Sequence, residues 1–119
     1  MKNPYITSKG HARAQISIQT NSSRELFDCM IDTGFSSGVA LGSRVQNQIP
    51  KQLVATQDFE LADGSLIRMD VYKISFKFRD IVFSALAIFT EGGDNLLGIE
   101  FLRNFKFILD LQNNRVQLQ

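Results

Sequence analysis

The stretch that decides the fold is Cys29-Met30-Ile31-Asp32-Thr33-Gly34-Phe35-Ser36-Ser37-Gly38. An apolar run ends at Ile31, and the acidic residue Asp32 follows at once. Gly34 and Gly38 then predict a loop in place of a continued strand. Alone, Asp-Thr-Gly indicates little, because all three residue types are common in turns. Its position is more informative, since a carboxylate at the end of a buried strand is partly withdrawn from water, which disfavours its charged form.

The residues before this stretch alternate between apolar and polar side chains. Residues 12–19 show the period of two that is typical of a half-buried strand. Residues 21–23 are Asn-Ser-Ser and predict a turn, after which residues 25–31 return as a second strand. The two strands are therefore expected to form a hairpin that ends at Asp32.

The residues after the loop continue the strand pattern. We predict a short strand at 39–41, a loop or one helical turn at 42–52, and a hairpin at Asp63-Gly64, which is the strongest turn signal in the chain. Residues 65–78 form a long strand whose apolar side chains move from odd to even positions. Such a shift reverses the buried face, so it predicts a bulge or a strand that passes from one sheet into another.

The last third of the chain contains several short apolar segments. Residues 81–89 are apolar at most positions and predict a strand that is buried on both faces. A loop at 91–94, a very short strand at 96–98, one short helix at 99–104, and strands at 105–109 and 116–118 follow. Short strands at this spacing predict an all-β fold, a closed barrel or sandwich with one short C-terminal helix, in a single domain over residues 1–119.

Composition narrows the classes of function. The 119 residues hold 13 Lys and Arg against 12 Asp and Glu. Because the chain has no surplus of basic residues, its charge does not point to a nucleic-acid partner. The sequence lacks the long apolar run that would predict a membrane anchor or a signal peptide. The single His11 and the single Cys29 disfavour a metal centre, and we expect neither a metal nor an organic cofactor. Cys29 is expected to be a core residue rather than a nucleophile, and the absence of any internal disulfide suits the cytoplasm.

A second informative stretch lies at residues 95–118, NLLGIEFLRNFKFILDLQNNRVQL. It reads as a Leu-Leu-Gly strand, a short amphipathic helix, an apolar strand and a hairpin. In this order, after an Asp-Thr-Gly strand end and a glycine-tipped hairpin, it resembles the retropepsin-like aspartic proteases, in a bacterial-type variant. The resemblance covers residues 12–118, and it implies the closed β-barrel of that family.

The resemblance also implies a role for particular residues. It assigns the catalytic loop to Asp32 as acid and base, Thr33 as a brace between paired loops, and Gly34 as the place where the loops meet. The family's flap, a hairpin that closes over the substrate, falls on residues 62–65, and Leu96-Leu97-Gly98 is expected beneath the catalytic loop. The substrate contacts expected in this chain are Phe35, Ser36, Ala62, Asp63, Gly64 and Ser65.

The chain departs from the family pattern at two places. Phe35 stands where many members have Ala or Ser, so that its ring either narrows a substrate subsite or packs into the barrel. Ile99-Glu100 replaces the Arg-Asp or Arg-Asn that follows the glycine in many viral enzymes. One further question stays open. Ser36 and Ser37 either bond the Asp32 carboxylate or cap the loop backbone, while surface, loop or turn positions are expected for Asp28, Asp94 and Asp110.

One Asp-Thr-Gly per chain supplies one carboxylate, so an active site of this kind requires a homodimer on a twofold axis. The expected function is an aspartic endopeptidase that cuts extended, largely apolar peptide segments with water activated by paired Asp32 carboxylates. One alternative is a catalytically idle, protease-like module that binds peptides by strand addition. Another is a structural β-domain in which Asp32 only forms a turn.

Overall fold

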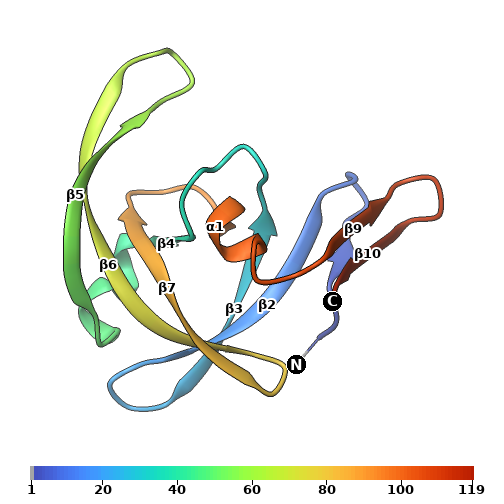
Figure 1. Ribbon diagram of the computed structural model, residues 1–119, viewed down its shortest axis with the longest axis horizontal. Helices are drawn as coiled ribbons and strands as arrows, with labels where there is room; N and C mark the ends of the chain where they lie inside the picture. The colour runs from blue at the N-terminus through green and yellow to red at the C-terminus, as the bar shows by residue number, and fades with distance from the viewer. Residues whose placement is uncertain (1) are drawn as a thin grey trace.

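The computed structural model describes residues 2–119, and it is built almost entirely of β-strands (Figure 1). The all-β prediction with one short C-terminal helix is confirmed. The strands of the main sheet are β1 (Tyr5–Ile6), β2 (Ala12–Gln19), β3 (Arg24–Ile31), β4 (Val39–Gly42), β5 (Gln52–Glu60), β6 (Leu66–Phe78), β7 (Ile81–Thr90) and β8 (Leu96–Leu97). The other elements are the 3-10 helix η1 (Ser43–Gln48), the helix α1 (Ile99–Leu102), and a second sheet of β9 (Phe107–Asp110) and β10 (Arg115–Leu118).

The main sheet curls on itself to enclose the core. Its strand order is β1-β2-β3-β8-β4-β7-β6-β5, and β2 also pairs with β6 at Ser17↔Lys77 and Ile18↔Phe76. This extra pairing joins two strands that are not neighbours in the order, so it closes the barrel. Aromatic rings fill the interior, where Phe76 lies 4.3 Å from Phe83 and 4.9 Å from Phe101 between ring centroids. Such contacts between rings add to the stabilisation by burial alone.

The change of apolar phase in β6 coincides with a bulge, one of the two predicted explanations, whereas the predicted passage into another sheet is not seen, because β6 stays within the eight-stranded sheet. The register between β5 and β6 shifts between Leu53 and Ala55, which makes Val54 an extra residue opposite the step from Val71 to Tyr72. The bulge thus lies in the partner strand. Beyond it, β6 runs on to pair with β2, so the long strand serves two parts of the sheet. The face of β6 that is buried therefore changes along the strand, as the strand with which β6 pairs changes.

The expectation that the strand at 81–89 is buried on both faces is only partly correct. Ala87, Ile88 and Phe89 are buried, but Ile81 and Val82 are each 58% exposed. The reason is the pairing of β7. Ala87 pairs with both β4 and β6 and the residues after it pair with β4, whereas residues 81–86 pair with β6 alone.

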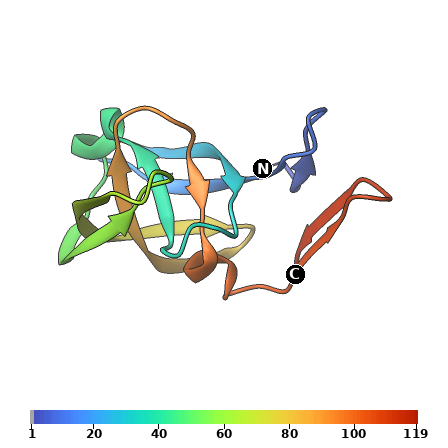
Figure 2. The same ribbon diagram turned by 90° about the horizontal axis from the view of Figure 1, so that it is seen from above.

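The C-terminal hairpin of β9 and β10 stands beside the barrel (Figure 2). Val116 and Leu118 are buried, whereas Leu109 is 45% and Leu111 is 61% exposed. Among residues 2–119, no helix has the length and apolar character needed to cross a bilayer.

Candidate active site

The loop of residues 32–38, called the Asp32 loop below, begins where β3 is paired with β8. The two-residue strand β8 lies between β3, to which it is parallel, and β4, to which it is antiparallel. The Asp32 N–H donates to the carbonyl of Leu97 at 2.9 Å. Because β8 is held on both sides, this bond fixes the backbone at Asp32.

The side chain of Asp32 is oriented by its own loop. Its Oδ1 accepts a hydrogen bond from the Gly34 N–H at 2.9 Å, and its carbonyl accepts one from the Phe35 N–H at 3.1 Å. Its Oδ2 has no hydrogen-bond partner among residues 2–119. Asp32 is half-buried, while Thr33 and Gly34 are exposed. The carboxylate is therefore positioned by one oxygen and available through the other.

A second support of the Asp32 loop requires glycine. The Gly98 N–H donates to the carbonyl of Gly38 at 2.7 Å, and the Ile99 N–H donates to the carbonyl of Phe35 at 2.9 Å. A Cβ atom on Gly98 would lie 2.3 Å from the Ser37 oxygen and 2.6 Å from the Phe35 oxygen. The segment after β8 therefore packs directly against the loop, as the resemblance implies, and a side chain at Gly98 would force the two apart.

The two serines of the loop differ in their surroundings. Ser37 is buried, and its carbonyl accepts the Glu100 N–H at 3.2 Å, whereas Ser36 is exposed. Within residues 2–119 neither hydroxyl forms a hydrogen bond with Asp32 or with the loop backbone. The bracing of the loop thus comes from main-chain groups, and neither of the two serine roles considered from the sequence is seen.

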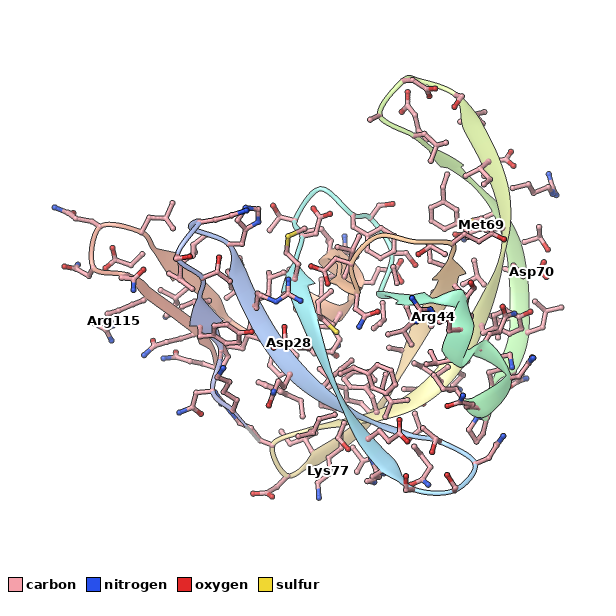
Figure 3. All side chains as sticks on the ribbon, turned by 180° about the vertical axis from the view of Figure 1, so that it is seen from behind. Asp28, Arg44, Met69, Asp70, Lys77 and Arg115 are labelled. Carbon is pink, nitrogen blue, oxygen red and sulfur yellow. The ribbon has the colours of Figure 1, made fainter. Side chains whose placement is uncertain are left out.

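An ion-pair cluster lies behind the loop. Arg13 on β2 donates from Nε to Asp28 Oδ1 at 2.5 Å, from Nη1 to Asp94 Oδ2 at 2.5 Å, and from Nη2 to Asp94 Oδ1 at 3.0 Å. The Tyr5 hydroxyl donates to the other oxygen of Asp28 at 2.5 Å. The hydrogen bond from Arg13 lowers the pKa of Asp94, and the same bond raises the pKa of Arg13. Figure 3 labels Asp28 in this cluster.

Asn95 connects the cluster to β8. Its carbonyl accepts the Met30 N–H at 2.8 Å, its Nδ2 donates to the Asp28 carbonyl, and its Oδ1 accepts the Gly42 N–H, both at 3.3 Å. The expectation that Asp28 and Asp94 are surface or loop carboxylates missed this role. They are partly exposed, yet they fix the segment that enters β8. Asp110 does lie at a turn, where it accepts two bonds from Asn113.

The hairpin of β5 and β6 rises beside the Asp32 loop (Figure 1). Its tip is closed by hydrogen bonds from the Leu61 N–H to the Ser65 carbonyl and from the Gly64 N–H to the Leu61 carbonyl, and Gly64 has a φ of 85°. Asp63 accepts hydrogen bonds from the N–H and the hydroxyl of Ser65 at 2.9 and 2.5 Å. These bonds lower the pKa of Asp63. The predicted turn at Asp63-Gly64 is therefore present, with glycine at the position that needs positive φ.

The two faces of this hairpin differ in chemistry. Cross-strand partners share a face, so the register places Ala55, Gln57, Phe59, Ile67, Met69 and Val71 together on one face, called the inner face below, which is apolar apart from Gln57. The opposite, outer face carries an ion pair between Asp58 and Arg68 at 3.7 Å and a hydrogen bond from Thr56 to Asp70 at 3.1 Å. An apolar inner face on an exposed hairpin indicates a surface that binds something apolar.

The inner face meets the Asp32 loop through aromatic rings. Phe35 and Phe59 lie 6.5 Å apart between centroids, and both pack with Met69 in one cluster. Phe35 therefore packs against the hairpin close to its tip, because Phe59 pairs with Ile67 only one pair before the turn. The other expected contacts separate into two groups, with Ser36 on the Asp32 loop and residues 62–65 at the hairpin tip. Among residues 2–119 no hydrogen bond or ion pair joins the tip to the loop.

Other kinds of site find less support. No cluster of three or more His, Cys, Asp or Glu side chains within residues 2–119 is arranged to hold a metal ion. Cys29 is fully buried, and this burial raises the pKa of its thiol, which disfavours the nucleophilic thiolate.

Comparison with known proteins gives an informative likeness among solved structures. No protein-family model and no curated protein matches the chain. Among solved structures, the chain is similar to a retropepsin-like aspartic protease from Rickettsia conorii, with a TM-score of 0.60 and 18% sequence identity. The match covers 92% of this chain and 84% of the other. At this level of identity the likeness shows the fold, and fold alone does not establish activity.

Proposed function

We propose that this chain is a retropepsin-like aspartic endopeptidase, active as a homodimer in which each subunit contributes Asp32 to one catalytic pair. The observation that carries the proposal is the state of Asp32. Its backbone is fixed by Leu97, one carboxylate oxygen is held by the Gly34 N–H, and the other has no partner in residues 2–119. The fold in which it sits is also that of a known aspartic protease.

The chemistry explains why two copies are needed. Two carboxylates about 3 Å apart cannot both ionise, so they share a proton. The ionised carboxylate takes a proton from water as the water oxygen attacks the peptide carbon, and the protonated carboxylate gives its proton to the carbonyl oxygen. The tetrahedral intermediate then transfers a proton to the nitrogen, the C–N bond breaks, and a carboxyl group and an amine are released. Since Asp-Thr-Gly occurs once, the second carboxylate comes from a partner.

The surface beside Asp32 is suited to such a partner. Thr33 is exposed, and it lines a hollow together with Met30, Phe107 and Leu109. Leu109 and Leu111 expose apolar side chains on the neighbouring hairpin. Twofold contact over this face would bury these groups and bring the two loops together, with Thr33 bracing them and Gly34 permitting close approach.

The substrate we propose is an extended, largely apolar peptide segment. It would lie between the Asp32 loop, with Phe35 and Ser36, and the inner face of the β5–β6 hairpin. Residues Ala62, Asp63, Gly64 and Ser65 at the tip would close over it. Closure excludes water from the reacting bond and allows main-chain hydrogen bonds to the peptide.

The experiment that tests the proposal compares wild type with Asp32→Asn on an internally quenched apolar peptide between pH 4 and 7. Loss of the general acid and base should lower the rate by at least about a hundredfold. Asp80→Asn, in the β6–β7 turn, is the matched control, and it should keep full activity. Circular dichroism checks that both variants are folded. Cleavage by Asp32→Asn at the wild-type rate would contradict the proposal.

Dilution tests the requirement for two subunits. The rate per chain should fall as the protein is diluted below the dissociation constant of the dimer, and it should recover on reconcentration. A rate per chain that is independent of concentration, for a protein shown to be monomeric by sedimentation, would overturn the dimeric site. A wild-type protein that binds the peptide without cutting it would identify an idle binding module instead.

A further inference from the structure

We propose that Glu91 gives the enzyme a preference for a Lys or Arg side chain at one position of the substrate. This inference rests on the proposed function, because it assigns a specificity residue to the same peptide-binding site. The structural basis is a hollow of about 600 Å³ between η1, the β5–β6 hairpin and the end of β7, with Glu91 at its edge. It is called the Glu91 hollow below.

Part of the wall of the Glu91 hollow is apolar and continues the surface beside the Asp32 loop. Ile67 and Met69 line it from the inner face of the hairpin, and Tyr72 and Phe89 line it from the barrel. The two aromatic rings lie 5.7 Å apart in an edge-to-face arrangement. Met69 also packs in the cluster that contains Phe35. An extended substrate beneath the hairpin would therefore reach this hollow with one of its side chains.

Three charged side chains line the hollow, Arg68, Asp70 and Glu91. Arg68 pairs with Asp58 at 3.7 Å, and Asp70 accepts a hydrogen bond from the neutral Thr56 hydroxyl, so that Asp70 keeps its negative charge beside that of Glu91. Glu91 is exposed, and within residues 2–119 it forms neither an ion pair nor a hydrogen bond.

Besides Arg68, one further cation lies close to the hollow. The ammonium of Lys51 is 5.6 Å from the Tyr72 ring centroid and 5.9 Å from that of Phe89. It donates to the Gln46 carbonyl at 2.6 Å and lies within 3.5 Å of the Ile49 carbonyl. Lys51 is therefore occupied by main-chain oxygens, and it leaves the Glu91 carboxylate for a cation from the substrate.

The position of Glu91 is restricted at both ends of its loop. On one side, the loop follows directly from β7, and the Thr90 hydroxyl donates to the Gly92 carbonyl at 3.4 Å. On the other side, Asp94 is held by two hydrogen bonds from Arg13. A short loop fixed at each end loses little freedom when it binds, so more of the attraction to a ligand is retained.

A Lys or Arg side chain matches both features of the hollow. Its methylene stem can lie along the apolar walls while its charged head reaches the carboxylate at the edge. An exposed ion pair contributes up to about 1 kcal/mol, which corresponds to about fivefold in affinity. A Glu side chain at the same substrate position should be disfavoured, because it would meet a like charge.

The experiment measures peptide binding to the inactive Asp32→Asn protein by fluorescence anisotropy. The peptides share one extended apolar sequence, and a single position at a time carries Lys, Arg, norleucine or Glu. At one position, Lys and Arg should bind about fivefold more tightly than norleucine, and Glu the least tightly. Adding Glu91→Gln should remove the difference, and Glu91→Lys should reverse it towards Glu. Glu60→Gln removes the same charge from the outer face of the hairpin and should leave the preference unchanged.

Three results would overturn the inference. These are equal binding of Lys and norleucine at every position, a preference that persists in Glu91→Gln, and failure of every peptide to bind. Cleavage plays no part in this measurement. A protein that cuts apolar peptides without a basic preference therefore refutes the role of Glu91 and leaves the proposed function standing. A protein that shows the preference but never cuts refutes the proposed function alone.

Discussion

The guanidinium of Arg13 donates to both carboxylate oxygens of Asp94, from Nη1 to Oδ2 at 2.5 Å and from Nη2 to Oδ1 at 3.0 Å. The two residues are 81 positions apart in the chain. Between Asp94 and β8 stands only Asn95, and β8 holds the backbone of Asp32. The pair therefore fixes the support of the proposed catalytic residue from outside the Asp32 loop. Bidentate geometry of this kind is the strong form of a surface ion pair.

Replacing Arg13 should destabilise the fold measurably. Arg13→Gln removes the shared partner of Asp28 and Asp94, and we expect a loss of about 2 kcal/mol in the free energy of unfolding. The matched control is Arg68→Gln, whose pair with Asp58 is longer, at 3.7 Å, and more exposed. It should cost less than about 0.5 kcal/mol. Urea unfolding of the three proteins gives both values, and equal losses would contradict the role of the cluster.

The same pair predicts how stability depends on pH. Because Arg13 lowers the pKa of Asp94 in the folded protein, the ionised carboxylate stabilises the fold at any pH above its unfolded value of about 3.9. This contribution is lost as the pH falls through the lower folded value. The difference in urea stability between wild type and Asp94→Asn should thus be constant from pH 7 to about 5 and shrink below about 4. In an Arg13→Gln background the pH dependence of the difference should be much smaller, and an unchanged dependence would contradict the assignment.

The sequence predicts most of the strands because each follows from local alternation or from a turn signal. It misses β1 and most of β5 for physical reasons. Tyr5 and Ile6 form a strand only by pairing with β2. The edge strand β5 pairs with β6 alone and contains a bulge, with exposed Leu53 and Val54, so that it lacks alternation. Tertiary pairing decides such segments rather than local propensity.

The candidate site likewise has one part that a local sequence pattern predicts and one part that depends on tertiary contacts. A strand end followed by Asp-Thr-Gly is a local pattern, and the structure places these residues in one loop as expected. The cluster around Arg13 depends on distant partners. In hindsight, the hairpin register sets Arg13 opposite Met30 and Gln15 opposite Asp28. Arg13 and Asp28 are therefore diagonal neighbours, which the predicted hairpin contained as a signal. Nothing local identifies Asp94 as the third member.

Gly98 should be intolerant of a side chain. A Cβ atom there would lie 2.3 Å from the Ser37 oxygen, so Gly98→Ala must displace the Asp32 loop or the start of α1. We expect a loss of about 3 kcal/mol in stability together with loss of peptidase activity. Gly42→Ala is the control, because its φ is −62° and its Cβ would contact nothing within 4 Å. It should be neutral or stabilising by about 0.5 kcal/mol. A fully stable Gly98→Ala protein would show that the packing is looser than described.

Cys29 should resist thiol reagents while the protein is folded. Its side chain is fully buried, and burial raises the pKa of the thiol, so that neither access nor ionisation favours reaction. Ellman's reagent at pH 8 should therefore modify the protein at least about a hundredfold more slowly than it does in 8 M urea. Rapid reaction of the folded protein would show that the core around β3 opens readily.

The contact between Phe35 and Phe59 should couple the Asp32 loop to the β5–β6 hairpin. The rings lie 6.5 Å apart between centroids, and their elements have no hydrogen bond to one another in residues 2–119. In a double-mutant cycle of Phe35→Leu and Phe59→Leu, the coupling energy in urea unfolding should be about 0.5 to 1 kcal/mol. Because the hairpin loses its aromatic contact with the loop, Phe35→Leu should also raise the KM for an apolar peptide more than it lowers kcat, since binding weakens without a change at Asp32. Phe78→Leu is the control, as this ring contacts Phe105 at 5.2 Å at the far side of the core. It should lower stability without changing KM.

Zero coupling energy, or a fall in kcat with unchanged KM, would show that Phe35 serves the catalytic loop itself and not the surface that receives the substrate.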